Sequence, residues 1–208
     1  MCSFAPFSGA SPTILTVPGL EGSGADHWQT LWEKSRPGTV RADLGDWTAP
    51  QRNAWVARLE DAITRAQAPV ILVAHSLGCL AVAWWAKVLP QPYGWPVAGA
   101  LLVAPADVDR DDAPVALRGF APTPAAPLPF PSIVVASADD PWMTVRRAHS
   151  LAVNWGSRFV DAGPLGHINV ASGIGSWPDG LDLVDGLAAD ALATSASRGQ
   201  RGDRRMPA

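Results

Sequence analysis

The chain is 208 residues long, which suits one well-buried core and is marginal for two. Hydrophobic residues make up 48% and charged residues 17%, a composition that favours a compact globular protein over a disordered one. The net charge of -3 provides no basic surface for nucleic acid or anionic lipid, so we expect neither as a partner.

The two cysteines, Cys2 and Cys79, cannot form a disulfide framework, and no cysteine and histidine cluster has the spacing of a zinc site. We therefore expect no metal and no cofactor, and a reducing compartment suits the thiols. The N-terminus lacks the basic start and apolar run of a signal peptide, and the longest apolar runs have only strand length. A soluble, cytoplasmic protein without a membrane contact is the expectation.

Short apolar runs rich in valine and isoleucine alternate with segments of helical period. In chain order, strands are predicted at 13–19, 39–43, 69–76, 97–105, 132–138 and 157–163, and helices at 25–35, 51–67, 77–89, 141–156 and 179–193. Several strands are continuously apolar, as expected when both faces of a sheet are covered. The pattern predicts an α/β protein with three α/β/α layers and a mostly parallel six-stranded sheet.

Two segments interrupt this alternation. Residues 107–131 are rich in proline and have no convincing period, which fits either a plain connector or a rim over an active site. Residues 195–208 are polar and basic with little to bury, and we expect a disordered tail there. The remaining residues, 1–194, are predicted to form a single domain.

The stretch "VILVAHSLGCLA" at 70–81 reads as a buried strand followed by a serine and a helix. Ala74 and Gly78 flank Ser76 at two residues before and two after, one methyl group away from the pattern G-x-S-x-G. Such a nucleophile elbow needs small residues at these positions, because the sharp turn brings neighbouring backbone close. Ser76 is therefore a candidate nucleophile, and its alternative role is an N-cap of the following helix.

A serine nucleophile needs a histidine base, which in this topology follows the serine along the chain. His27 precedes Ser76, His75 is adjacent to it, and His149 falls inside a predicted helix. His167 follows the last predicted strand in a loop rich in glycine and proline, where a catalytic base is expected. We therefore choose His167 as the candidate base. Its alternative role is that of an ordinary surface histidine in a loop.

The third member of such a set is an acid that orients the histidine. Asp139 and Asp140 follow the predicted strand at 132–138, directly before Pro141. Either aspartate could instead cap the following helix. Asp107, which follows the strand at 97–105, is the second choice for the acid.

An oxyanion hole needs backbone N–H donors from the residue after the nucleophile and from the loop after the first strand. Leu77 supplies the first donor. In the loop "VPGLEGSG", Gly19 permits a tight turn, and Leu20 is our choice for the second donor. Among the tryptophans, Trp28 and Trp142 each follow a loop of the predicted site and are candidates for substrate binding.

Four stretches in this order, "VPGLEGSGADHWQTLWE", "HSLGCLA", "SADDPW" and "GHIN", resemble the compact α/β-hydrolases related to retinoblastoma-binding protein 9. The resemblance spans residues 13–192. It implies a serine hydrolase without a cap domain and a catalytic triad of Ser76, Asp140 and His167. The Leu-x-Cys-x-Glu motif credited with retinoblastoma protein binding lacks its glutamate at 77–81, so that partner is not expected.

The leading hypothesis is a serine esterase that cleaves small carboxylic esters through an acyl-enzyme on Ser76. An amidase or aminopeptidase is an alternative, because the same triad permits it and contacts to the leaving group would decide between a small ester and an amide substrate. A third hypothesis is a binding module that kept the fold without turnover. The complete set of candidate residues argues against this last hypothesis.

Overall fold

The computed structural model describes residues 11–66 and 68–202, which contain one sheet of six strands. The strands are β1 (Thr13–Val17), β2 (Thr39–Arg41), β3 (Val70–His75), β4 (Val97–Val103), β5 (Ser132–Ala136) and β6 (Arg158–Asp161). All neighbouring strands pair in parallel, in the order β2-β1-β3-β4-β5-β6. The order reverses between β1 and β3, which is the place where open parallel sheets form ligand sites.

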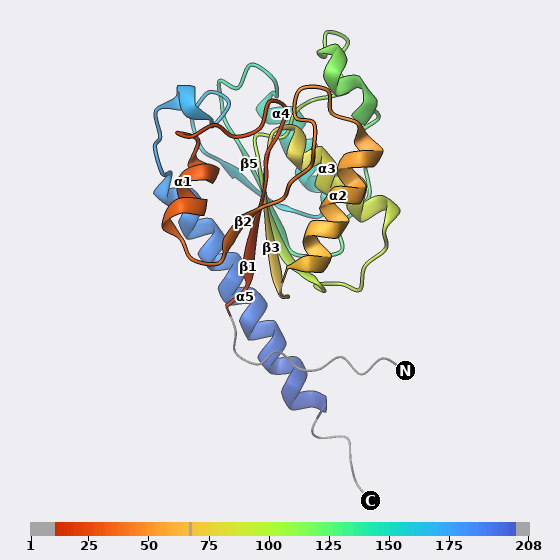
Figure 1. Ribbon diagram of the computed structural model, residues 1–208, viewed down its shortest axis with the longest axis vertical. Coiled ribbons are helices and arrows are strands. Elements are labelled where there is room, and N and C mark those ends of the chain that lie inside the picture. The colour runs from red at the N-terminus through yellow and green to blue at the C-terminus, as the bar shows by residue number, and fades with distance from the viewer. Residues whose placement is uncertain (1–10, 67, 203–208) are drawn as a thin grey trace, which may run out of the picture.

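Helices cover both faces of the sheet and give three layers (Figure 1). The helices are α1 (Trp28–Ser35), α2 (Arg52–Arg65), α3 (Leu77–Val88), α4 (Val145–Trp155) and α5 (Pro178–Gly202), with short 3-10 helices η1 (Val115–Phe120) and η2 (Val170–Ser172). One apolar cluster joins the sheet to α2, α3 and α4, and a second joins its opposite face to α1 and α5. The predicted α/β fold is confirmed.

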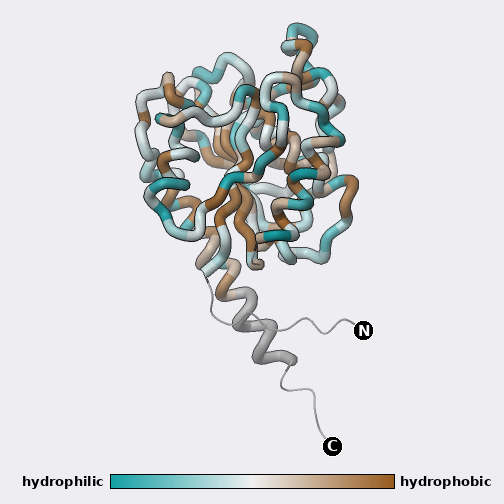
Figure 2. The backbone as a smooth tube through the Cα atoms, viewed as in Figure 1, coloured by the Kyte–Doolittle hydropathy of each residue, from teal (hydrophilic) through white to brown (hydrophobic). Residues whose placement is uncertain are grey.

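The strands divide their apolar side chains between these two clusters. In β3, Leu72 packs with the α2, α3 and α4 side, whereas Ile71 and Val73 pack with the α1 and α5 side. All six residues of β3 are buried: five apolar residues and, at the end, His75. Figure 2 shows the same hydrophobic centre beneath a more polar surface. The rigid centre fixes where the loops at the carboxyl ends of the strands begin.

Most element ends differ from the prediction by three residues or fewer, and two helix boundaries differ by more. Helix α4 begins at Val145 instead of residue 141, because the hydroxyl of Thr144 accepts the amide of Arg147 as the N-cap. The expectation that one aspartate of the preceding pair caps this helix is therefore wrong. The backbone of α5 is helical to Gly202, well past the predicted domain end at 194. The rest of the predicted tail, residues 203–208, lies outside the described residues.

A search of the described helices finds none that is both long enough and apolar enough to cross a membrane.

Candidate active site

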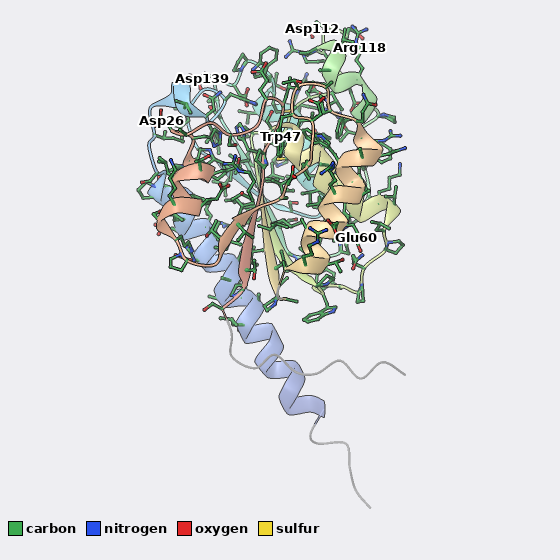
Figure 3. The ribbon with its side chains drawn as sticks, in the orientation of Figure 1. Asp26, Trp47, Glu60, Asp112, Arg118 and Asp139 are labelled. Atoms are coloured by element: carbon green, nitrogen blue, oxygen red, sulfur yellow. The ribbon has the colours of Figure 1, made fainter. Side chains whose placement is uncertain are left out.

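The candidate site residues lie at one edge of the sheet, where the parallel strands have their carboxyl ends. Ser76 follows β3, Asp140 follows β5, and His167 follows β6. Figure 3 labels Asp26, Asp112 and Asp139 from the loops of this edge, all in the upper part of the view, while Glu60 of α2 lies lower. Parallel pairing thus gathers residues that are far apart in sequence.

Ser76 occupies the sharp turn between β3 and α3. Its φ of 53° and ψ of -122° place a residue with a side chain in a rarely populated region. The serine precedes the first residue of α3, but its side chain makes no capping hydrogen bond. The alternative of a simple N-cap is therefore wrong, and the hydroxyl is free for another partner.

Close backbone contacts explain the small residues around this turn. A Cβ added to Gly78 would lie 2.2 Å from the carbonyl oxygen of Val17, at the end of β1. One added to Gly19 would lie 2.9 Å from the Cβ of Ser76 and 3.0 Å from the amide nitrogen of Leu77. Both glycines thus let the loop after β1 pass directly against the serine turn.

This packing also bears on the two expected backbone donors. Leu77 is the first residue of α3, so its N–H has no carbonyl partner within the helix. Leu20 directly follows Gly19 and lines the same cleft as Ser76. The amide of Glu21 donates to the carbonyl of Trp47, which holds this loop in place. The geometry is compatible with the predicted pair of donors, Leu20 and Leu77.

Ser76, His167 and Asp140 form a continuous hydrogen-bonded chain. Nε2 of His167 lies 2.9 Å from Oγ of Ser76, and Nδ1 lies 3.0 and 2.9 Å from the two carboxylate oxygens of Asp140. A carboxylate only accepts, so Nδ1 carries the proton in the neutral ring and Nε2 can accept the serine proton. The side chains of His167 and Asp140 are 11% and 1% exposed, which keeps the arrangement away from bulk water.

The other candidate acids lie elsewhere. Asp107 accepts from Nε of Arg147 at 3.4 Å and does not contact His167. Asp139 accepts from the hydroxyl of Ser137 at 2.8 Å and from the amide of Gly166 at 2.7 Å, one residue before the histidine. These two hydrogen bonds lower the pKa of Asp139. Asp140 therefore faces His167, and Asp139 holds the loop that carries His167.

A cleft of about 750 Å³ opens over Ser76. Its walls include Leu20, Leu117 of η1, and Trp142, whose side chain is 43% exposed. The segment 107–131 therefore forms part of the rim of the cleft, which is one of the two roles predicted for it. Trp142 lies where a substrate contact was predicted.

Trp28 does not lie in this cleft, and its prediction as a substrate contact needs correction. Its side chain is 1% exposed and turns inward from the start of α1 against Trp32 and Trp177. The indole Nε1 donates to the carbonyl of Ile168 at 2.9 Å. Trp28 thus supports the loop that carries the histidine from behind.

Two further histidines, His27 and His75, which were not predicted as site residues, also line the cleft. The ring of His75 lies 5.0 Å from that of His167 and 4.9 Å from that of His27, measured between centroids. Burial lowers the pKa of His27 to about 4 and that of His75 well below the ordinary value of 6.5, with smaller contributions from nearby positive charge. Both rings are therefore neutral at pH 7.

Within the described part of the chain, no group of three or more histidine, cysteine, aspartate or glutamate side chains is arranged to hold a metal ion.

The chain is similar to several proteins of known structure. A YdeN-like hydrolase from Pectobacterium atrosepticum is 33% identical, with a TM-score of 0.76 over 87% of this chain and 92% of that one. The ydeN gene product from B. subtilis is 20% identical, with a TM-score of 0.68 over 85% and 98%. Est1E from Butyrivibrio proteoclasticus, a structure with bound ferulic acid, is 12% identical, with a TM-score of 0.59 over 89% and 90%. The last two likenesses concern the fold alone.

Comparison with curated proteins finds no significant match. The family profile described as serine hydrolase matches residues 14–186, which include the elbow, the acid loop and the histidine loop. The narrower resemblance to relatives of retinoblastoma-binding protein 9 stays a prediction. On the strength of the profile and of the 33% identity to a YdeN-like hydrolase, the chain belongs to the serine hydrolase family.

Proposed function

We propose that the protein is a serine esterase for small carboxylic esters, with Ser76 as nucleophile, His167 as general base and Asp140 as the residue that orients the imidazole. The observation that carries the proposal is the 2.9 Å contact between Oγ of Ser76 and Nε2 of His167, on a serine whose backbone is held at positive φ. A serine that only capped a helix would need neither feature.

In the proposed reaction, His167 takes the proton of Ser76 as Oγ attacks the ester carbonyl. The amides of Leu20 and Leu77 donate to the oxyanion of the tetrahedral intermediate. His167 then gives its proton to the departing alkoxide, which leaves an acyl-enzyme. A water molecule, deprotonated by the same histidine, hydrolyses the acyl-enzyme and restores Ser76.

Asp140 supports both half-reactions without changing its own charge. Its carboxylate accepts from Nδ1 of His167 through both oxygens, which fixes the tautomer and stabilises the imidazolium as it forms. A hydrolase-fold protein that served only as a binding module would have no need for this ordered chain. Trp142 and Leu117 at the cleft walls are proposed to contact the substrate through apolar surface.

Labelling with a fluorophosphonate probe tests the nucleophile without a known substrate. We expect the wild type to be labelled, and Ser76→Ala to lose both labelling and ester hydrolysis, the latter by several orders of magnitude. Ser150→Ala is the matched control, because that exposed serine only bonds to Arg146 on α4. Equal labelling of wild type and Ser76→Ala would refute the proposal.

A further inference from the structure

His75 is a buried histidine to which the proposed reaction gives no task. It is the last residue of β3 and directly precedes Ser76, but the sharp turn limits the size only of the residues two before and two after the serine. The side chain is 6% exposed and lies between the rings of His27 and His167. Burying an imidazole costs free energy that an aliphatic side chain would not cost. We therefore expect the ring nitrogens of His75 to make a hydrogen bond that compensates for this cost.

His75 makes such a hydrogen bond to the backbone of His167, the proposed base. Nε2 of His75 lies 2.9 Å from the carbonyl oxygen of His167. A carbonyl oxygen only accepts, so Nε2 of His75 must carry the hydrogen. Because burial keeps the ring neutral, the hydrogen on Nε2 leaves Nδ1 without one. The structure thus determines the tautomer of His75.

The backbone that this bond holds is strained. Ile168, the residue after the base, has a φ of 48°, which is a costly conformation for a β-branched side chain. Two buried donors bind the carbonyl oxygens on either side of its Cα. His75 donates to the carbonyl oxygen of residue 167, and the indole of Trp28 donates to that of residue 168. The strained turn after His167 is therefore clamped at two successive carbonyls.

We propose that His75 is a positioning residue for His167: its Nε2–H holds the backbone of the base so that the imidazole keeps its place between Ser76 and Asp140. This inference rests on the proposed function, because it assigns a task within the same site. The donor comes from the residue next to the nucleophile, so the serine turn and the histidine loop are tied together directly. In this proposal His75 acts through the backbone of His167 and takes no part in the proton transfers.

Three substitutions separate positioning from simple packing. His75→Leu removes the donor and keeps a buried side chain, whereas His75→Gln offers an amide N–H at about the reach of Nε2. We expect His75→Leu to lower kcat for p-nitrophenyl butyrate roughly 100-fold with KM unchanged, the loss that a small misplacement of a catalytic group can cause. His75→Gln should recover most of it. The control His149→Gln, on the exposed face of α4, should match the wild type.

Two kinetic results would overturn the proposal. One is a folded His75→Leu protein with the kcat of the wild type, and the other is a folded His75→Gln protein as slow as His75→Leu. A purely structural role would lower the melting temperature and leave the kcat of the folded fraction unchanged. Failure of the esterase proposal is recognised separately, since the wild type itself would then show neither labelling nor turnover.

A measurement on the wild type decides the matter even if a variant does not fold. Nitrogen-15 NMR of labelled histidine distinguishes the two neutral tautomers, because protonated and bare ring nitrogens have well-separated shifts. We expect His75 to be protonated at Nε2 and bare at Nδ1. The opposite tautomer would remove the donor to His167 and with it the proposal.

Discussion

Asp139 and Asp140 show how two identical neighbours acquire different tasks. The carboxylate of Asp140 is almost fully buried and faces Nδ1 of His167, whereas Asp139 binds Ser137 and the amide of Gly166. Both residues belong to the turn that follows β5, and in this turn only the side chain of Asp140 reaches the imidazole. The loop-holding bonds of Asp139 lower its pKa, and it stays ionised at neutral pH.

Replacing each candidate acid by its amide tests this division of tasks. We expect Asp140→Asn to lower kcat for a p-nitrophenyl ester by roughly 10³–10⁴-fold, because an asparagine no longer fixes the productive tautomer of His167. Asp107→Asn should have a much smaller effect, since Asp107 binds Arg147 and the amide of Asp109 and does not contact His167. Asp139→Asn should fall between them through a looser loop. Similar kcat values for all three variants would contradict the assignment.

At single residues, a candidate role can be predicted from the sequence where it follows from position in the chain. Ser76 and His167 are recognisable because they follow strands within diagnostic loops, and the structure brings them together. The inward turn of Trp28 and the bond made by His75 depend on contacts with Ile168 and His167, more than 90 positions away. Local pattern carries no information about such contacts, so both tasks were missed.

Among the elements, β1 and the serine turn pack closely against each other. Gly78 in the first turn of α3 faces the carbonyl oxygens of Val17 and Pro18 at distances that leave no room for a methyl group. This contact sets how closely the loop after β1 can approach Ser76. It therefore links the stability of the fold to the geometry of the proposed oxyanion donors.

The same substitution at two helical glycines should have opposite effects on stability. Gly78→Ala should lower the free energy of unfolding by about 1–3 kcal/mol or more, because the added methyl group displaces β1 or α3. Gly186→Ala in α5 meets open space and should raise it by up to about 1 kcal/mol through helix propensity. Urea unfolding measures both. Destabilisation of equal size at both sites would contradict the packing argument.

The segment 107–131 contributes one short 3-10 helix, η1, and no layer of helices over the cleft. An acyl chain that extends beyond the walls formed by Leu117 and Trp142 remains in water. Each methylene left exposed forgoes about 0.8 kcal/mol of transfer free energy. The segment thus favours short substrates.

Hydrolysis of p-nitrophenyl esters of increasing length checks this consequence. We expect kcat/KM to be highest for acyl chains of roughly two to six carbons, because longer chains add no binding energy in the transition state. The spontaneous hydrolysis of each ester provides the baseline. A kcat/KM that still climbs through decanoate would mean a deep acyl tunnel.

Element types were predicted from local periodicity, and all six predicted strands and five predicted helices exist, most of them with ends within three residues of the prediction. The start of α4 was missed because Pro141 and Thr144 are both good helix-start residues, and only the observed cap at Thr144 decides between them. The extent of α5 was missed because polar, basic composition gives little evidence for or against a helix.

For the whole molecule, buried neutral histidines couple stability to pH. Burial is the main reason that the pKa of His27 falls from 6.5 to about 4, and it also lowers that of His75. Below pH 6.5 the unfolded chain takes up protons that the folded protein refuses. The free energy of unfolding therefore falls as the pH decreases from about 6.5 towards 4, by at most ~1.4 kcal/mol per pH unit for each histidine.

His27→Asn isolates one of these contributions. An asparagine can still accept the amide of Gln29 as the N-cap of α1, but it does not titrate. Urea unfolding at pH 7 and pH 5 should show a smaller loss of stability in the variant than in the wild type. Equal losses would mean that His27 is protonated in the folded protein at pH 5.

The order of the strands also divides the proposed machinery along the chain. Ser76 and the backbone donors precede the connection at 107–131, whereas Asp140 and His167 follow it. Strands β4 and β5 pair across this division, from Ala100 and Ser132 onward. A chain cut in the connection would yield two fragments, each inert alone, and restored hydrolysis would report their reassembly. The topology would thus allow the chain to be used as a split reporter, in which the two fragments associate by pairing β4 with β5.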